Sequence, residues 1–235
     1  MIKQLRIDLR RISNPIRAKH SQRFFKTGPG QYGENDLFLG PSVPQCRAIA
    51  KKYSHLSLPS ITRLLKSKYH EERLIALLIL VHQFEKGDVP SRKKIYDLYL
   101  SSTKHINNWD LVDVTTPKIV GAYLLDKDWS TLKKLARSPN LWERRIAILA
   151  TFTFTCAGNP RPTLEISTSL LNDKQDLIHK AVGWMLREVG KRCSQKILTD
   201  FLDSHLRLLP RTTLRYAIER FPEPLRQKYL SGSIA

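Results

Sequence analysis

The feature that most constrains the fold is the spacing of the apolar residues, which follows a helical period along nearly the whole chain. In residues 71–84, apolar side chains recur three and four positions apart, two acids stand in the first turn, and Gly87 follows the end. Alternation typical of a half-buried strand is missing from the sequence. We therefore predict an all-α chain. Besides 71–84, the expected helices are 14–26, 44–54, 58–68, 91–102, 118–126, 129–137, 140–156, 162–171, 174–192, 194–208 and 211–221.

The breaks between these helices are short and carry Pro, Gly, Asn or Asp, as in residues 87–90, 138–140 and 158–162. Helices joined in this way favour antiparallel pairs stacked into a curved α-solenoid. No residue pattern recurs at a fixed period, so the array is expected to be irregular and HEAT-like rather than tetratricopeptide or ankyrin. A compact bundle is the alternative, although a dozen helices would lack an obvious common core. We treat residues 1–235 as a single domain.

The charge of the chain points to a polyanionic partner. There are 40 Lys and Arg residues against 21 Asp and Glu, which gives a formal net charge of +19. Residues 1–30 hold many of the cations and the single acid Asp8. Nucleic acid and an anionic membrane surface are the two candidate partners. We favour nucleic acid, because no apolar run approaches the roughly 18 residues needed to span a membrane. The basic start faintly resembles an organelle transit peptide, but residues 22–39 continue without a cleavage-like break.

The cysteines and histidines do not predict a metal or cofactor site. Cys46, Cys156 and Cys193 are odd in number and widely separated, so we expect a reducing compartment, the cytoplasm, and no zinc or disulfide framework. The seven His residues are scattered, and the sequence holds neither a phosphate-binding loop nor a dinucleotide turn. We expect no metal and no small-molecule cofactor.

The segment 105–113 carries the most suggestive chemistry. A helix through it would place Trp109 and Asp113 four residues apart on one face, with a carboxylate beside an aromatic plane. The stretch starts at Asn108 and runs to Thr-Thr-Pro at 115–117, so we expect a short helix of two turns. The competing interpretation is that an Asp in a first turn serves as a cap or as a satisfied core group.

A second candidate surface lies on the helix expected over residues 173–192. Lys180, Trp184, Arg187 and Lys191 fall within about 60° of arc, which makes a basic stripe with a Trp embedded in it. A solvated face with one half-buried Trp is an equally good interpretation of this helix alone.

Two arginines in the expected helix 140–156 differ in direction. Arg145 lies on the side of Trp142 and Leu149, whereas Arg144 points nearly opposite. An Arg at the edge of an apolar face either extends its head group to water or is aimed at a fixed anion, and its planar fork suits phosphate. The sequence leaves both readings open.

Taken in order, three of these segments resemble the motifs of a known family. Residues 108–113 (Asn-Trp-Asp-Leu-Val-Asp), 142–149 (Trp-Glu-Arg-Arg-Ile-Ala-Ile-Leu) and 181–188 (Ala-Val-Gly-Trp-Met-Leu-Arg-Glu) resemble the three motifs of the AlkD family of DNA alkylation-repair glycosylases. Residues 38–40 (Phe-Leu-Gly) with Val-Pro at 43–44 resemble the N-terminal helix junction of that family. The resemblance extends over essentially the whole chain.

The resemblance implies a HEAT-like solenoid whose concave basic face holds duplex DNA. It also implies removal of cationic N3- and N7-alkylated purines, such as 3-methyladenine and 7-methylguanine, without drawing the base into a deep pocket. Carried over by motif, the catalytic cluster is Trp109, Asp113 and Trp184, with Arg145 at a phosphate. The expected DNA-binding residues are Arg145, Lys180, Arg187, Lys191 and, with a smaller effect, Arg144.

Two departures from the family leave substrate preference open. Asn108 stands where some members have a second Trp, and the Gly-Pro-Gly-Gln-Tyr loop at 28–32 is absent from those members. We expect a monomer that works on alkylated duplex DNA in the cytoplasm, at the nucleoid.

The chemistry agrees with this interpretation. Glycosidic cleavage passes through an oxocarbenium-like state, and a base that is already cationic leaves as a neutral molecule, so one carboxylate suffices. The rival hypothesis is a non-catalytic HEAT-like scaffold that binds DNA or RNA through the same basic surface. Such a scaffold has no need of Asp113 near two Trp residues, because a carboxylate facing phosphates weakens an electrostatic binder.

Overall fold

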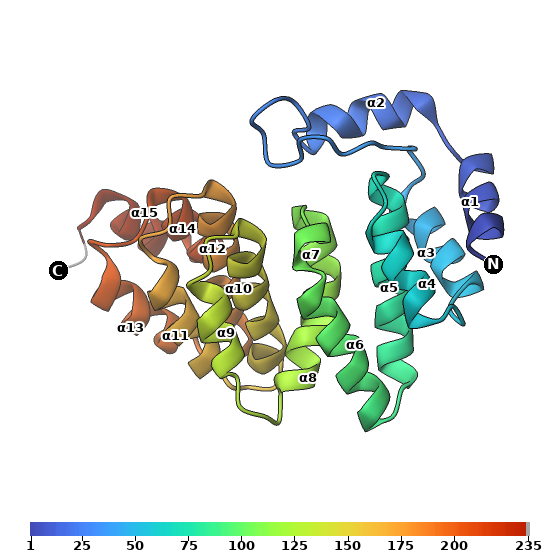
Figure 1. Cartoon of the computed structure of the whole chain (residues 1–235). Helices are drawn as coiled ribbons and strands as arrows, with labels where there is room; N and C mark the ends of the chain where they lie inside the picture. The colour runs from blue at the N-terminus through green and yellow to red at the C-terminus, as the bar shows by residue number, and fades with distance from the viewer. Residues whose placement is uncertain (234–235) are drawn as a thin grey trace. The chain divides into compact units, whose positions relative to one another are not determined.

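The computed structural model describes residues 1–233, and within them the regular structure is helical (Figure 1). The sole bridge of strand type in these residues is an isolated pair between Leu37 and Tyr69. The chain divides into two compact units, Met1–Ile119 and the remainder from Val120 on, and each is described by itself. The expected all-α class is confirmed.

The first unit is built around a long helix, α5, with an uninterrupted apolar run at residues 74–81. Helix α5 has Leu74, Ile75, Leu77 and Leu80 fully or almost fully buried, and α3, α4, α6 and α7 pack on it. The elements of this unit are α1 (Ile2–Arg11), α2 (Pro15–Phe24), α3 (Val43–Lys52), α4 (Leu58–Leu65), α5 (His70–Lys86), α6 (Val89–Ser101), η1 (Thr103–His105) and α7 (Trp109–Thr116).

In the second unit, helices that follow one another in the sequence pack together. Helices α9 and α11 contact α10, while α13 and α14 contact α12. After a π-helical turn at Pro117–Gly121, its elements are α8 (Ala122–Leu124), α9 (Ser130–Ala136), α10 (Leu141–Cys156), α11 (Arg161–Leu170), α12 (Asp176–Arg192), α13 (Gln195–His205), α14 (Arg211–Ala217) and α15 (Glu223–Ser231).

The local sequence explains where several helices begin. The Asn14 side chain accepts a hydrogen bond from the Arg17 N–H, and the Asn140 side chain accepts one from the Trp142 N–H. Proline stands in the first turn of α2, α3, α4, α6, α11 and α15, where its missing N–H costs nothing. These signals make the helix starts readable from the sequence.

The sequence missed two helices at the ends of the chain. Helix α1 has apolar residues at helical spacing, Ile2, Leu5 and Leu9, but the sequence analysis considered this segment only for its charge. Helix α15 buries only Tyr229 and has little apolar spacing to mark it. Polar contacts also hold α1 to its neighbours. Its Arg6 Nη2 lies 2.9 Å from Glu72 Oε2, and its Asp8 accepts hydrogen bonds from Lys52 Nζ and Tyr53 Oη.

One turn between α2 and α3 requires glycine. Gly40 has φ +87°, and a Cβ there would lie 2.2 Å from the carbonyl oxygen of Asn14. The segment 38–40 therefore passes directly against the start of α2.

The packing of α12 on α14 gives a first prediction. A Cβ on Gly183 would lie 2.5 Å from the Thr213 carbonyl oxygen, whereas one on Gly190 would meet the end of the Leu198 side chain at 2.6 Å. The backbone carbonyl of Thr213 cannot move aside to make room for a methyl group, whereas the Leu198 side chain can change its conformation. We expect Gly183→Ala to lower the free energy of unfolding by about 1–3 kcal/mol, and Gly190→Ala to be neutral or slightly stabilising through helix propensity. Urea denaturation measures both, and equal stability of the two variants would contradict this packing.

Candidate functional site

Four consecutive charged or polar residues are buried at the start of α5. His70, Glu71, Glu72 and Arg73 are each at most 4% exposed. Together they contact α1, the segment 36–40 and α7. Buried charges are costly unless they are paired or hydrogen-bonded, so these contacts determine where the neighbouring segments lie.

The contacts of Glu71 and Glu72 fasten the N-terminal segments. The Glu71 carboxylate accepts the backbone N–H groups of Leu39 and Gly40, at 2.8–3.1 Å. Glu72 accepts hydrogen bonds from the Arg6 guanidinium. The two acids also stand in the first turn of α5, where the helix dipole favours negative charge.

His70 links α5 to α7. Its Nε2 lies 2.8 Å from Asp110 Oδ2, and its Nδ1 lies 3.5 Å from Asp36 Oδ2. Burial by itself would lower the pKa of His70, but the Asp110 charge and hydrogen bond, together with Asp36, raise that pKa to about 9. His70 is therefore a buried cation at neutral pH.

Asp36 completes this network. Its Oδ2 lies 2.7 Å from Arg73 Nη2, and its Oδ1 accepts a hydrogen bond from Asn107 Nδ2 at 3.2 Å. Burial acts to raise the pKa of Asp36, but the hydrogen bond with His70 and the Arg73 charge outweigh it and hold the pKa below its ordinary value. Asp36 and Asp110 thus share the buried cation between them.

Helix α7 is the short helix that the sequence predicts at this place. Asn108 is its N-cap and its side chain accepts the Trp109 N–H at 2.8 Å, which gives a physical reason for an Asn at this position. At the other end, the buried Tyr99 hydroxyl lies 2.9 Å and 2.8 Å from the Thr115 and Thr116 hydroxyls. Helix α7 is held at both ends.

The half-buried face of α7 carries the two predicted catalytic residues, Trp109 and Asp113. The Trp109 ring stacks on Phe25, with centroids 5.2 Å apart, and meets Phe24 edge to face at 5.6 Å. Burial raises the pKa of Tyr99 to about 12, and the negative charge of Asp113 contributes to this rise. The Asp113 carboxylate therefore lies near the Tyr99 hydroxyl. Phe24 and Phe25, which the sequence did not single out, form the aromatic surroundings of Trp109.

The two arginines of helix α10, Arg144 and Arg145, have different surroundings. Arg144 Nε lies 2.6 Å from Asp173 Oδ2, and its Nη1 donates to the carbonyls of Ser138 and Pro139. Most of its donors are thus used within the protein. Arg145 is only 5% exposed and donates from Nη1 to the Leu177 carbonyl. Trp142 and Leu149 are buried with Arg145, as the predicted helix register requires.

The predicted stripe on α12 is present. Trp184 is half-buried with its ring 6.4 Å from that of Phe152, and Lys191 is exposed. Lys180 pairs with Asp176 at 2.7 Å, and Arg187 pairs with Glu219. Arg187 Nε is buried and lacks a hydrogen-bond partner within residues 1–233.

A cavity of about 690 Å³ opens beside this stripe, against α14 and α15. Lys180 and Arg187 line it, and Arg215 and Arg226 add two cations that the sequence analysis missed, because nothing in α14 or α15 marked them. Its remaining lining residues are Asp176, Thr212, Tyr216 and Glu219. The cations outnumber the acids, as suits a phosphate-bearing partner.

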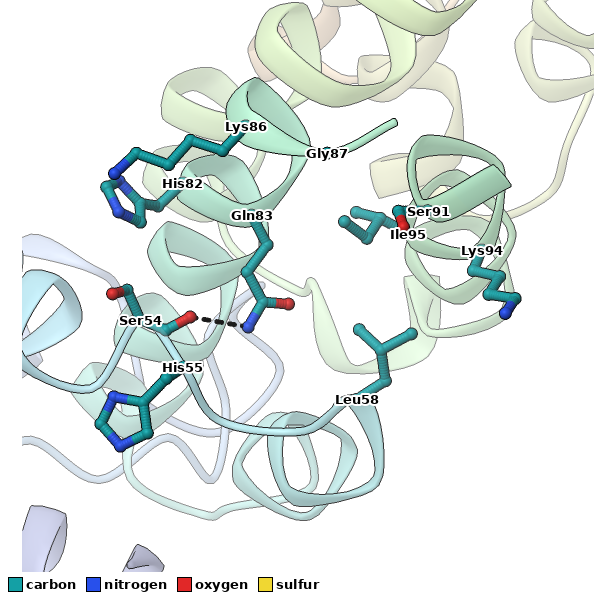
Figure 2. Close-up of a pocket in the computed structure, with 10 residues that line it drawn as sticks. All are labelled: Ser54, His55, Leu58, His82, Gln83, Lys86, Gly87, Ser91, Lys94 and Ile95. Carbon is teal, nitrogen blue, oxygen red and sulfur yellow. Dashed lines mark hydrogen bonds between the residues drawn. The ribbon is translucent and has the colours of Figure 1, made fainter. Parts of the chain in front are cut away.

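A different cavity, of about 460 Å³, lies at the far end of α5 in the first unit (Figure 2). Gln83 crosses it and donates to the Ser54 carbonyl at 2.8 Å. His82 is twelve residues beyond His70, so this cavity is roughly 18 Å along the helix from the buried network. No carboxylate lines it, and it offers nothing for glycosidic chemistry. Its lining comprises Ser54, His55, Leu58, His82, Gln83, Lys86, Gly87, Ser91, Lys94 and Ile95.

Within residues 1–233, no cluster of three or more His, Cys, Asp or Glu side chains is placed to hold a metal ion. Over the same residues, no helix combines the length and the apolar character needed to cross a membrane.

The described residues form an all-helical protein, and the comparisons give its family. The family model described as DNA alkylation repair enzyme matches residues 5–221, and the chain therefore belongs to that family. A solved structure described as a predicted DNA alkylation repair enzyme from Enterococcus faecalis is similar, with a TM-score of 0.68 and 15% identity. The match covers 90% of this chain and 97% of that one. No curated protein matches.

The network of His70 gives a second prediction. His70 has a folded-state pKa above its ordinary value, so its contribution to stability is complete below about pH 6.5 and is lost as the pH rises through about 9. The difference in unfolding free energy between wild type and His70→Gln should shrink from pH 6 to pH 10, by an amount of the order of 3 kcal/mol at most. Urea denaturation at each pH measures it. His55→Gln, at an exposed position, should keep the wild-type slope, and an unchanged slope in His70→Gln would contradict the buried cation.

Proposed function

We propose that this chain is a DNA glycosylase of the AlkD type, which hydrolyses the N-glycosidic bond of cationic N3- and N7-alkylated purines in duplex DNA. The single observation that carries the proposal is the pair Trp109 and Asp113 on the half-buried face of α7, in a chain that belongs to the DNA alkylation repair enzyme family. The reacting base is not drawn into a deep pocket in this proposal.

Asp113 is the catalytic carboxylate of the proposal. The bond breaks as positive charge develops on the deoxyribose, and a fixed carboxylate stabilises that charge or orients the attacking water. Trp109 presents an aromatic face to the same cation and contributes about 0.5–2 kcal/mol. Trp184 carries the corresponding motif of the second unit, and on that motif alone we propose it as the second aromatic residue of the reaction. The base takes the bonding electrons and leaves neutral.

No general acid is required at the leaving base, and the neighbouring histidines do not offer one. Burial first, and then the Lys104 and Lys66 charges, lower the pKa of His105, so His105 is neutral at pH 7. His70 is a cation, but it is 2% exposed and bound between two carboxylates. A cationic alkylated base needs no proton donor to leave, so it is the substrate that this arrangement of histidines favours.

The second unit supplies the proposed contacts to phosphate. Lys180, Arg187 and Lys191 on α12 form the stripe beside Trp184, and Arg145 has the phosphate-contacting role that its family motif implies. Arg144 has most of its donors engaged within the protein, so we expect it to contribute less. The net charge of +19 supports a duplex partner, and the protein would act at the nucleoid as a monomer.

The first test separates chemistry from binding. Asp113→Asn should reduce release of 7-methylguanine from methylated duplex at least 100-fold, while the Kd for duplex stays within about twofold or tightens, because a negative charge is lost but no phosphate contact. Asp97→Asn, at an exposed acid on α6, removes the same charge and should release base normally. Loss of both binding and release in folded Asp113→Asn would assign the residue a structural role.

The charge of the lesion gives a further prediction. The protein should release 7-methylguanine and 3-methyladenine but neither uracil nor 1,N6-ethenoadenine, since no acid is available to protonate a neutral leaving base. Phe at position 109 or 184 should retain more activity than Leu, because a weaker aromatic face remains. Chromatography of released bases measures both. Rapid uracil release would refute the charge requirement, and salt-sensitive duplex binding without any base release would favour the scaffold hypothesis.

A further inference from the structure

The cavity of about 460 Å³ at the C-terminal end of α5 has no part in the proposed glycosylase reaction (Figure 2). Its volume falls in the range of roughly 300–1,000 Å³ that is usual for sites that bind small molecules. Its walls come from three elements of the first unit, namely the segment 54–58, the last turns of α5 and the first two turns of α6. The chemistry of these walls indicates which class of ligand fits.

Hydrogen bonds hold the three walls together. The Gln83 side chain donates from Nε2 to the carbonyls of Ser54 and Leu56, at 2.8 and 2.7 Å, and so ties that wall segment to α5. On the opposite side, Arg92 donates from Nε to the Phe84 carbonyl at 3.0 Å, which ties the start of α6 to the end of α5. The cavity is therefore formed before any ligand enters, and a ligand does not have to order its walls.

The charge of the lining is positive. Lys86 and Lys94 line the cavity with exposed side chains, and no Asp or Glu lines it. Lys94 interacts electrostatically with Asp88, which lies outside the lining. The acid next to Lys86 in the sequence, Glu85, lies 3.9 Å from Lys118 Nζ, and Lys86 itself forms no ion pair within residues 1–233. Lys86 is therefore a reachable cation that the protein leaves open to an anionic ligand.

A histidine stands beside this cation. His82 and Lys86 are four positions apart on α5, and their side chains lie on the same side of Gln83 (Figure 2). His82 is half-buried, and an imidazole ring offers an N–H donor in either protonation state. Leu58 and Ile95 lie on the other side of Gln83, and the half-buried Leu58 offers the larger apolar surface. The cavity thus has a cationic side and an apolar side.

We propose that this cavity binds a small organic phosphate, with the phosphate at Lys86 and His82 and the organic group against Leu58. A phosphate monoester carries nearly two negative charges at neutral pH and has three acceptor oxygens. It therefore matches an ammonium group beside an imidazole N–H better than a singly charged carboxylate does. The proposal concerns binding in the first unit, and it depends neither on glycosylase activity nor on the proposed DNA contacts of the second unit.

Titration calorimetry of the full chain with four probes tests the two sides of the cavity. The probes are phenyl phosphate, methyl phosphate, benzoate and phenol, at near-physiological salt so that attraction to the overall charge is screened. We expect saturable binding of one phenyl phosphate per chain at millimolar concentration or below. Methyl phosphate lacks the apolar group and benzoate lacks the second charge, so each should bind at least threefold more weakly, and phenol should not bind measurably.

A matched pair of variants and the histidine resonances locate the binding. Lys86→Gln should weaken phenyl phosphate binding about fivefold or more, because it removes the ammonium group at the phosphate. Lys51→Gln removes the same charge from an exposed position of α3 outside the cavity and should bind as the wild type does. In NMR spectra, phenyl phosphate should shift the ring resonances of His82 and leave those of His20 on α2, which does not line this cavity, in place.

Three results would overturn the proposal. Equal binding by Lys86→Gln and Lys51→Gln would show that Lys86 does not hold the phosphate and that only the overall charge attracts it. Benzoate or methyl phosphate binding as tightly as phenyl phosphate would remove the case for a phosphate on one side and an apolar group on the other. Absence of saturable phenyl phosphate binding at millimolar concentration, or unmoved His82 resonances in a saturated sample, would show that the cavity is not a site for this ligand.

Discussion

The buried charges at the start of α5 are the constraint on which the first unit depends. His70, Glu71, Glu72 and Arg73 lie inside the protein, and together they bind α1, the segment 36–40 and α7. Removing one partner of a buried charge pair costs several kcal/mol because the other charge is left uncompensated. The pairs therefore specify how α1, the segment 36–40 and α7 are placed, beyond what apolar packing alone would require.

Helix α7 shows what this placement achieves. Eight residues make a marginal helix by themselves, yet this one is capped by Asn108, bound by His70 through Asp110, and anchored by Tyr99 at its last turn. Trp109 and Asp113 are consequently held on a rigid support. Such preorganisation is what electrostatic stabilisation of a developing cation requires, since a carboxylate that must reorient loses much of its effect.

Asp110 and Asp113 are one turn apart and have different surroundings. Asp110 is bonded to a buried cation and borders a small aromatic cavity, while Asp113 lies on the half-buried face with Trp109. Two carboxylates in different environments can take different roles: Asp110 fixes α7 to α5 through His70, while Asp113 is the proposed catalytic carboxylate.

Apolar spacing and capping residues were enough to predict the all-α class, most helix positions and the short helix at Trp109, because these are properties of local sequence. The same patterns placed Trp109 with Asp113, and Arg145 with Trp142, on common helix faces. They could not show that His70, Asp36 and Asp110, separated by up to 74 residues in the chain, form one buried network. Nor could they show that Phe25 covers Trp109 or that Asp173 binds Arg144. Those contacts join segments remote in the sequence, and only tertiary packing decides which remote groups meet and which charges are removed from water.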